Sequence, residues 1–235
     1  MEGEQKQFVI VGGSSGIGLG IVNRLSAAGH DVTVVSRTWD QSSALPSVRH
    51  LAFDVTSDEF PAADLPDVID GVAYCPGSIR LRSFRGLKPD AFREDFELNV
   101  LGAIKSIQAC LKGLRAADSA SVVFFSTVAV GLGLPLHASV ASAKGALEGL
   151  ARTLAAELSP KIRVNCIAPA LVNTPLAGQF FGDEEKEKAM ASRYPLARTG
   201  EVEDIASMAE FLLTGATGIT GQTLGVDGGM STVRK

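Results

Sequence analysis

The sequence lacks long hydrophobic runs, an excess of positive charge and any paired arrangement of cysteines. No apolar stretch approaches the roughly 20 residues of a membrane-spanning helix, and the polar start shows no signal-peptide pattern. A net charge of −4 argues against a nucleic-acid partner. Cys75, Cys110 and Cys166 are scattered without CxxC spacing, which predicts buried thiols in a reducing compartment and no metal site. We therefore expect a soluble, cytoplasmic protein without a membrane or nucleic-acid partner.

What the sequence does contain is an alternation of short β-branched runs and longer helical patterns. Its 235 residues and 46% hydrophobic content suit a single α/β domain, residues 1–235, with one core. Strands are expected at 8–11, 32–36, 51–53, 71–73, 122–126, 164–168 and 223–226. Helices are expected at 16–28, 89–114, 140–158, 184–193 and 202–213. This alternation predicts a Rossmann-type fold, in which a doubly wound parallel sheet lies between two helical layers. The connection 38–50 is short for a parallel crossover, so we expect it to lack a full helix.

A glycine-rich segment joins the first expected strand to the first expected helix. Glycines permit a tight turn, and the helix amino end offers free N–H groups and a positive dipole end to a pyrophosphate. The segment therefore predicts a dinucleotide cradle, with a tight turn that binds no ligand as the alternative. The cradle residues would be Gly12, Ser14, Ser15, Gly16, Ile17 and Gly18.

The residues after the second expected strand bear on the choice of cofactor. An acidic residue there would bind the ribose 2′-hydroxyl of NAD, whereas an arginine suits a 2′-phosphate. Arg37 stands nineteen residues after Gly18, Ser36 precedes it, and no acid accompanies them. We expect NADP(H) to be preferred over NAD(H). A solvated loop arginine is the alternative.

Four further positions form a recognisable frame. Thr127 ends an apolar run, Val140 follows thirteen residues later, Lys144 follows after four more, and Asn99 lies upstream. With the glycine spacing and the terminal segment 218–229, this frame resembles the short-chain dehydrogenase/reductase family, which places Ser, Tyr and Lys in this order. The resemblance covers nearly the whole chain. It implies an oxidoreductase that acts on a carbonyl/alcohol pair by hydride transfer.

The resemblance also implies roles for individual residues. Lys144 would hold the nicotinamide ribose, Thr127 would orient the substrate, and Asn99 would support a proton relay and line the cofactor. The remaining cofactor contacts carried over from the family are Asp54 and Val55 for the adenine, and Gly77, Pro169 and Thr174 elsewhere along the cofactor.

Val140 stands where the family has its proton-donating tyrosine, and it cannot transfer a proton. Loss of one acid–base group removes about 10² to 10⁴ in rate. Three interpretations stay open: another donor, a nucleotide-binding regulatory or scaffold protein with little turnover, or an enzyme that tolerates the substitution. As a donor, His137 is chemically suited, since histidine titrates near pH ~6.5. A plain loop histidine is its alternative, and Ser139, Ser142 and water are weaker candidates.

Other segments depart from the family or suggest partners. Segment 74–77 reads Tyr-Cys-Pro-Gly where the family has Asn-Asn-Ala-Gly, and Tyr74 is expected to pack in the core. Region 175–195 corresponds to the family's substrate lid, and Phe180 and Phe181 could face an apolar substrate or simply pack. The basic run 79–88 is interpreted as a solvated loop, with an anionic substrate as the alternative. Small residues in 89–114 and 140–158 favour a homo-oligomer, a tetramer or a dimer, as in relatives.

Overall fold

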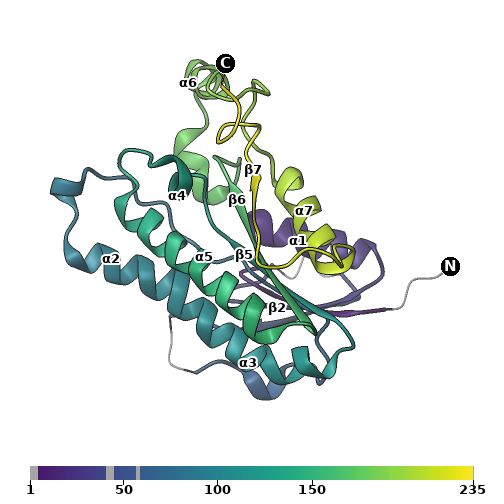
Figure 1. The fold of residues 1–235 in the computed structure, drawn as a ribbon. Helices are drawn as coiled ribbons and strands as arrows, with labels where there is room; N and C mark the ends of the chain where they lie inside the picture. Colours follow the sequence, from purple (N-terminus) through teal and green to yellow (C-terminus); the bar gives the residue numbers. More distant parts are fainter. Residues whose placement is uncertain (1–4, 41–44, 57–58, 235) are drawn as a thin grey trace.

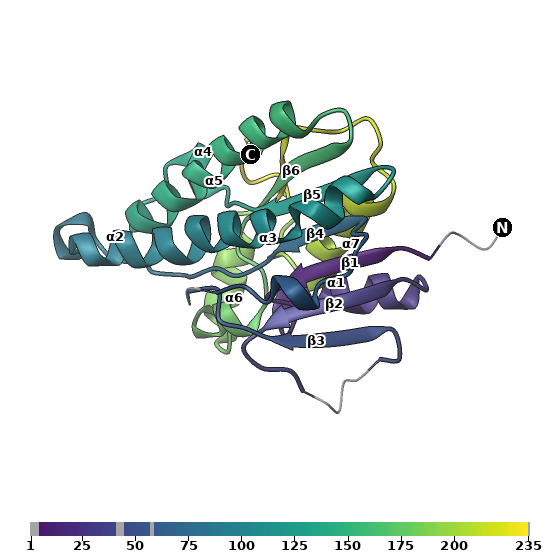
Figure 2. The same cartoon turned by 90° about the horizontal axis from the view of Figure 1, so that it is seen from below.

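The computed structural model describes residues 5–40, 45–56 and 59–234. These residues form a seven-stranded, fully parallel sheet in the order β3-β2-β1-β4-β5-β6-β7 (Figures 1 and 2). The strands are β1 (Gln7–Val11), β2 (Asp31–Ser36), β3 (Val48–Ala52), β4 (Gly71–Tyr74), β5 (Ala120–Phe125), β6 (Ile162–Pro169) and β7 (Thr223–Val226). All seven expected strands are confirmed. The central ones are apolar on both faces because helices cover both sides of the sheet.

Two helical layers enclose the sheet and create two apolar cores. One layer holds α1 (Gly16–Ala27) and α7 (Val202–Thr214), and the other holds α2 (Pro89–Phe96), α3 (Gly102–Ala116) and α5 (Ala138–Leu158). The short helices α4 (Ala129–Leu132) and α6 (Glu184–Ala191) follow β5 and β6. The predicted three-layer Rossmann-type fold is thus confirmed. Since the strand order runs outward in both directions from β1 and β4, their carboxyl ends flank the crevice where such sheets bind ligands.

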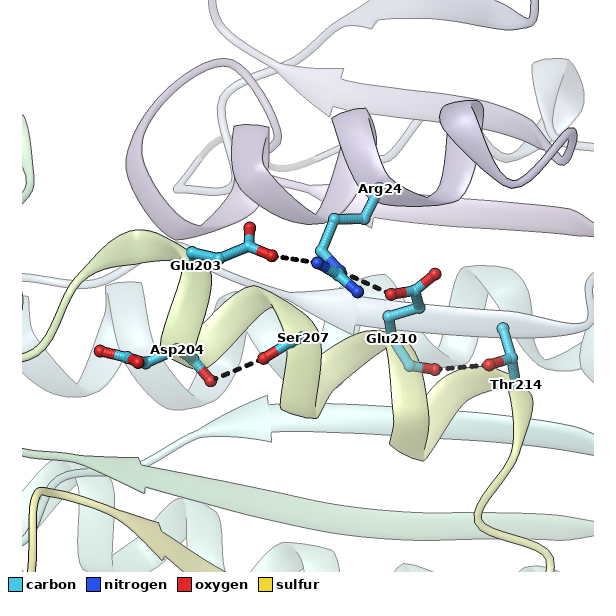
Figure 3. Close-up of polar contacts among 6 residues, drawn as sticks. All are labelled: Arg24, Glu203, Asp204, Ser207, Glu210 and Thr214. Carbon is cyan, nitrogen blue, oxygen red and sulfur yellow. Dashed lines mark hydrogen bonds and ion pairs between the residues drawn. The ribbon is translucent and has the colours of Figure 1, made fainter.

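An ion-pair network ties α1 to α7 on one face of the sheet. Figure 3 shows Arg24 of α1 between two carboxylates of α7. Its Nε donates to Glu210 at 2.5 Å, and a second guanidinium nitrogen donates to Glu203. Beneath this network, a Cβ at Gly20 would lie 2.5 Å from Val202 Cγ1, so the two helices approach closely. The network therefore fixes α1, whose amino end carries the predicted cradle.

The expected helix 89–114 is interrupted by a π turn at Glu97–Leu101, between α2 and α3. The Tyr74 hydroxyl, at the end of β4, donates to the Leu98 carbonyl inside this turn at 2.6 Å. Gly102 makes the approach possible, because a Cβ there would collide with the Tyr74 hydroxyl oxygen. Tyr74 is fully buried, which confirms its expected core role.

Smaller differences from the sequence-based expectations have local causes. β3 begins at Val48, three residues earlier than expected. The sequence did not reveal this start, because the edge strand carries Arg49 and His50 and lacks a continuous apolar run. Residues 41–44 of the connection 38–50 lie outside the described residues, and its described remainder contains no helix.

Two expectations from the sequence concerned the burial of the cysteines and the lack of a membrane-spanning segment. All three cysteines are free; Cys110 and Cys166 are buried as expected, while Cys75 is partly buried. The compartment stays a prediction. Within the described part of the chain, no helix combines the length and apolar character needed to cross a membrane.

Candidate active site

The predicted cradle lies where β1 passes into α1. Gly12 and Gly16 adopt φ values of +75° and +52°, which side chains rarely tolerate. A Cβ on Gly12 would lie 2.9 Å from Pro76 Cδ, and one on Gly18 would collide with the Gly12 carbonyl. Ser15 precedes α1 without a side-chain cap, and the first turn of α1 carries no acidic residue. The amino end of α1 is therefore unneutralised, as an anion site requires.

At the carboxyl ends of β2 and β3, the predicted cofactor residues differ in exposure. Ser36 is buried, and its hydroxyl donates to the Thr38 carbonyl at 2.8 Å. Arg37 is exposed. Two hydrogen bonds from Thr56, with a smaller contribution from the charge of Arg37, lower the pKa of the exposed Asp54 carboxyl. An arginine and a carboxylate thus share this edge.

Val55 differs from the other predicted cofactor residues because its side chain packs in the core. It belongs to the cluster beneath α3, and its Cβ would lie 3.3 Å from a Cβ on Gly102. Its backbone is therefore the part that remains suited to contact a ligand.

Three predicted site residues from three segments converge. A Cβ on Gly77 would lie 3.4 Å from Lys144 Nζ and 3.5 Å from Asn99 Oδ1. Asn99 lies in the π turn, and its Nδ2 donates to the Asp95 carbonyl at 2.7 Å. Its buried Oδ1 has no hydrogen-bond partner among the described residues. The turn therefore presents an acceptor beside the ammonium of Lys144, and glycine at position 77 keeps this space open.

Lys144 lies on α5 and is only 7% exposed. Burial lowers its pKa to about 8, and Cys166, Cys75 and Asp95 oppose that shift. Burial also raises the pKa of each of the two thiols to about 12, so both are neutral near pH 7. Asp95 is therefore the neighbour whose charge favours the ammonium form of Lys144 under neutral conditions.

Asp95 is a feature that sequence reasoning missed. It follows two charged residues in α2, which is typical of a solvated helix face, yet it is 1% exposed. The Ser78 hydroxyl donates to its Oδ1 at 2.6 Å, and Arg80 Nε lies 3.9 Å from the same oxygen. Arg80 also donates to Glu94 at 2.5 Å, so one cation of the basic run 79–88 is held within the protein.

A cavity of about 360 Å³ joins the cradle to the catalytic frame. The predicted residues that line it are Ile17, Gly77, Thr127, His137, Lys144, Pro169 and Thr174, together with Val140. Val140 is buried and presents a hydrocarbon surface. The cavity also receives residues that sequence reasoning did not single out: Leu134, Leu171, Arg193, Tyr194 and Met230. They come from four segments far apart in the chain, and only Arg193 and Tyr194 fall in a region, 175–195, that the sequence linked to the substrate.

His137 immediately precedes α5, and its Nδ1 lies 2.7 Å from the Pro135 carbonyl. A carbonyl oxygen only accepts, so Nδ1 carries a hydrogen and Nε2 is left for other partners. Of the two serines considered as donors, Ser142 is exposed and donates to the Ala138 carbonyl, while Ser139 is buried. Neither serine lines the cavity, whereas His137 does.

Comparison with known proteins gives consistent matches along the chain. A family model described as Enoyl-(Acyl carrier protein) reductase matches residues 11–231. L-xylulose reductase from Bos taurus is 34% identical over 233 residues, covering 95% of this chain and 96% of the relative. Thermoplasma acidophilum aldohexose dehydrogenase superposes with a TM-score of 0.89 at 25% identity, covering 98% of this chain and 96% of that one. A short-chain type dehydrogenase/reductase from Mycobacterium ulcerans gives 0.87 at 30% identity, covering 98% and 91%.

Proposed function

The chain belongs to the short-chain dehydrogenase/reductase family, and on that premise we propose that it is an NADP(H)-dependent oxidoreductase acting on a carbonyl/alcohol pair. The observation that carries the proposal is the convergence of Lys144 and Asn99 on Gly77. Lys144 and Gly77 line a cavity that reaches Ile17 at the amino end of α1. A buried ammonium and an unpartnered amide oxygen suit a ribose hydroxyl that must both accept and donate. The oxidoreductase relatives support the same chemistry.

The residues at the cradle fit a nicotinamide dinucleotide. The glycines keep the backbone within reach of a diphosphate, and the first turn of α1 adds no opposing carboxylate. Arg37 at the end of β2 favours a 2′-phosphate, and Ser36 would contribute through its backbone because its hydroxyl is held by Thr38. Asp54 and the Val55 backbone would meet the adenine, and Pro169 and Thr174 would lie along the nicotinamide half. When bound, the cofactor supplies or accepts a hydride.

The proton must come from a group other than Val140. We assign it to His137, which lines the same cavity and whose Nδ1 is held by the Pro135 carbonyl. Reduction would also require one proton at the substrate oxygen. His137 Nε2 would donate that proton, and the ring would regain one from solvent. Thr127 would orient the carbonyl oxygen through its hydroxyl, and Lys144 would hold the ribose.

A second candidate function is a nucleotide-binding regulatory or scaffold protein with little turnover. Val140 favours it, because the cavity has a hydrocarbon surface where the family places its acid. Cofactor binding would then persist, since the cradle and Lys144 do not depend on position 140.

The test begins with the affinities for NADPH and NADH, followed by a screen of aldehydes and ketones. Variants Val140→Tyr and His137→Ala are compared with His30→Ala, a control whose ring packs against Phe8 outside the cavity. We expect turnover in the native chain, loss of about 10² or more in His137→Ala, and no change in the control. Val140→Tyr should raise turnover by a comparable factor. NADPH binding with no turnover of any substrate supports the regulator, and failure of both nucleotides to bind refutes both functions.

We also propose a homo-oligomer formed through the α2, α3 and α5 layer. Phe96 is 41% exposed there, Leu101 is 36% exposed, and a Cβ on Gly149 would meet open space. Such surfaces suit close packing of helices against a second copy. Light scattering should give a mass at least twice that of one chain, and Gly149→Arg should reduce it. A monomeric native protein would contradict this proposal.

A further inference from the structure

The walls of the cavity beyond the catalytic frame are mostly hydrocarbon. Side chains from five separate segments supply them: the loops after β4 and β6, the loop before α5, the turn at 175–180 and helix α6. The residues are Leu81, Leu134, Leu171, Leu176, Phe180 and Met190. Val140 extends this surface to the reacting end of the cavity. A substrate that fills the cavity therefore meets apolar groups on most sides.

The polar groups on the same walls already serve the protein. The Ser126 hydroxyl donates to Glu148 at 2.5 Å, and the Ser78 hydroxyl donates to Asp95 at 2.6 Å. Neither serine has a second hydrogen to give to a ligand.

Two further hydroxyls are also engaged. Thr174 Oγ1 donates to the Val172 carbonyl at 3.4 Å and accepts from the Ala177 N–H at 3.3 Å, and Tyr194 Oη accepts from the Leu171 N–H at 3.1 Å. Arg193 is exposed, so water already solvates its guanidinium. Thr127, His137 and Lys144 remain, and the reacting carbonyl and the cofactor use all three.

We propose that the cavity takes an apolar aldehyde or ketone rather than a polyhydroxylated one; this inference rests on the proposed oxidoreductase function. Each substrate hydroxyl buried against these walls without a partner would cost about tenfold or more in affinity. Each methylene buried there would gain about fourfold. The two effects have opposite signs, so the cavity separates these classes strongly. Two of the similar proteins are named for sugars. The apolar walls of this cavity disfavour such polyhydroxylated substrates.

The test measures binding of 2-pentanone, 2-heptanone, 2-nonanone and L-xylulose to the full chain by calorimetry, with and without saturating NADP⁺, which cannot reduce the ketones. Affinity should rise about fifteenfold for each added pair of methylenes, and L-xylulose should show no saturable binding. A flat series, or L-xylulose binding as tightly as 2-nonanone, would overturn the inference. Failure of NADPH to bind would count against the proposed function instead. The ketone series in the nucleotide-free protein would still decide whether the cavity prefers apolar ligands.

A matched pair of variants separates the cavity wall from general surface effects. Leu176 lines the cavity and is 53% exposed, while Leu196 is 64% exposed and lies outside the lining. Leu176→Asn keeps the side-chain size, so folding should be retained, and 2-nonanone affinity should fall severalfold. Leu196→Asn should leave that affinity unchanged. Equal effects in both variants would refute the role of the wall.

Discussion

The contact between Tyr74 and the π turn makes a quantitative prediction about stability. Gly102 lies opposite the Tyr74 hydroxyl, and a Cβ there would overlap the oxygen while lying 3.3 Å from Tyr74 Cζ and from Val55 Cβ. Gly102→Ala should therefore destabilise the native chain through the oxygen alone. In a Tyr74→Phe background that atom is absent, and the remaining contacts are tight but tolerable. The effects of the two substitutions should not add.

The expected magnitudes come from three contributions. Overpacking of a buried contact costs about 1–3 kcal/mol, and Ala in place of Gly in a helix recovers up to about 1 kcal/mol. Gly102→Ala should therefore lower the free energy of unfolding by about 1–2 kcal/mol. Tyr74→Phe removes a buried hydrogen bond to Leu98 and should cost about 1 kcal/mol. Addition of Gly102→Ala to Tyr74→Phe should then cost almost nothing, which gives a coupling of about 1–2 kcal/mol.

Urea unfolding of the four proteins measures this coupling as a double-mutant cycle. Gly131→Ala is the control, because Gly131 is an exposed helical glycine whose Cβ would meet no atom within 4 Å. The control should be neutral or slightly stabilising in both backgrounds. Additivity of Gly102→Ala and Tyr74→Phe within about 0.5 kcal/mol would refute the proposed contact. A changed denaturant slope in one variant would point instead to an altered unfolded state.

Three further predictions concern Lys144 and Arg37. Affinity for NADPH should fall as the pH rises through about 8, because the ammonium of Lys144 is lost there; Lys144→Arg should flatten this titration, and a flat profile in the native chain would contradict the role. Asp95→Asn should move the midpoint lower, while Glu94→Gln should not. Lys144 should also make the nucleotide-free protein more stable as the pH rises from about 8 to 10.5, because in that window its side chain is still protonated in the unfolded chain but not in the folded one. Urea unfolding midpoints across this pH range measure the change in stability. Arg37→Ala should weaken NADPH binding about tenfold and leave NADH binding nearly unchanged, with Arg82→Ala as the control; equal losses for both nucleotides would exclude 2′-phosphate recognition.

The sheet could be predicted because its strands are buried on both faces and appear as short apolar runs. Only the extent of β3 was predicted poorly. This strand lies at the edge of the sheet, needs no continuous apolar run and carries Arg49 and His50. The π turn could not be predicted, because its defining contact comes from Tyr74, which lies 24 residues before Leu98. A helical pattern over 89–114 is compatible with one continuous helix. Only the packing of β4 against it shows where the helix is interrupted.

Within the site, the positions of the motif residues could be predicted from the sequence, but the burial and contacts of the site residues could not. Lys144 and Asn99 were located from the resemblance to the family, and the structure brings both beside Gly77. Asp95 was missed because a carboxylate beside two charged residues in a helix is usually solvated. Its burial depends on Ser78 and on the packing of α2 against α5, which local sequence does not encode.

The two departures from the family pattern lie in different parts of the site and have different physical effects. Tyr74 occupies a core position and donates to the Leu98 carbonyl, next to Asn99, whose amide oxygen lies beside Gly77 as Lys144 does. This tyrosine therefore supports the cofactor side of the site. Val140 faces the cavity and continues its hydrocarbon wall. Tyr74→Phe should therefore weaken NADPH binding and leave the ketone chain-length series intact. Val140→Thr, a substitution of similar size, should weaken 2-nonanone binding and leave NADPH binding unchanged. Weaker 2-nonanone binding in Tyr74→Phe, together with weaker NADPH binding in Val140→Thr, would contradict this division of the site.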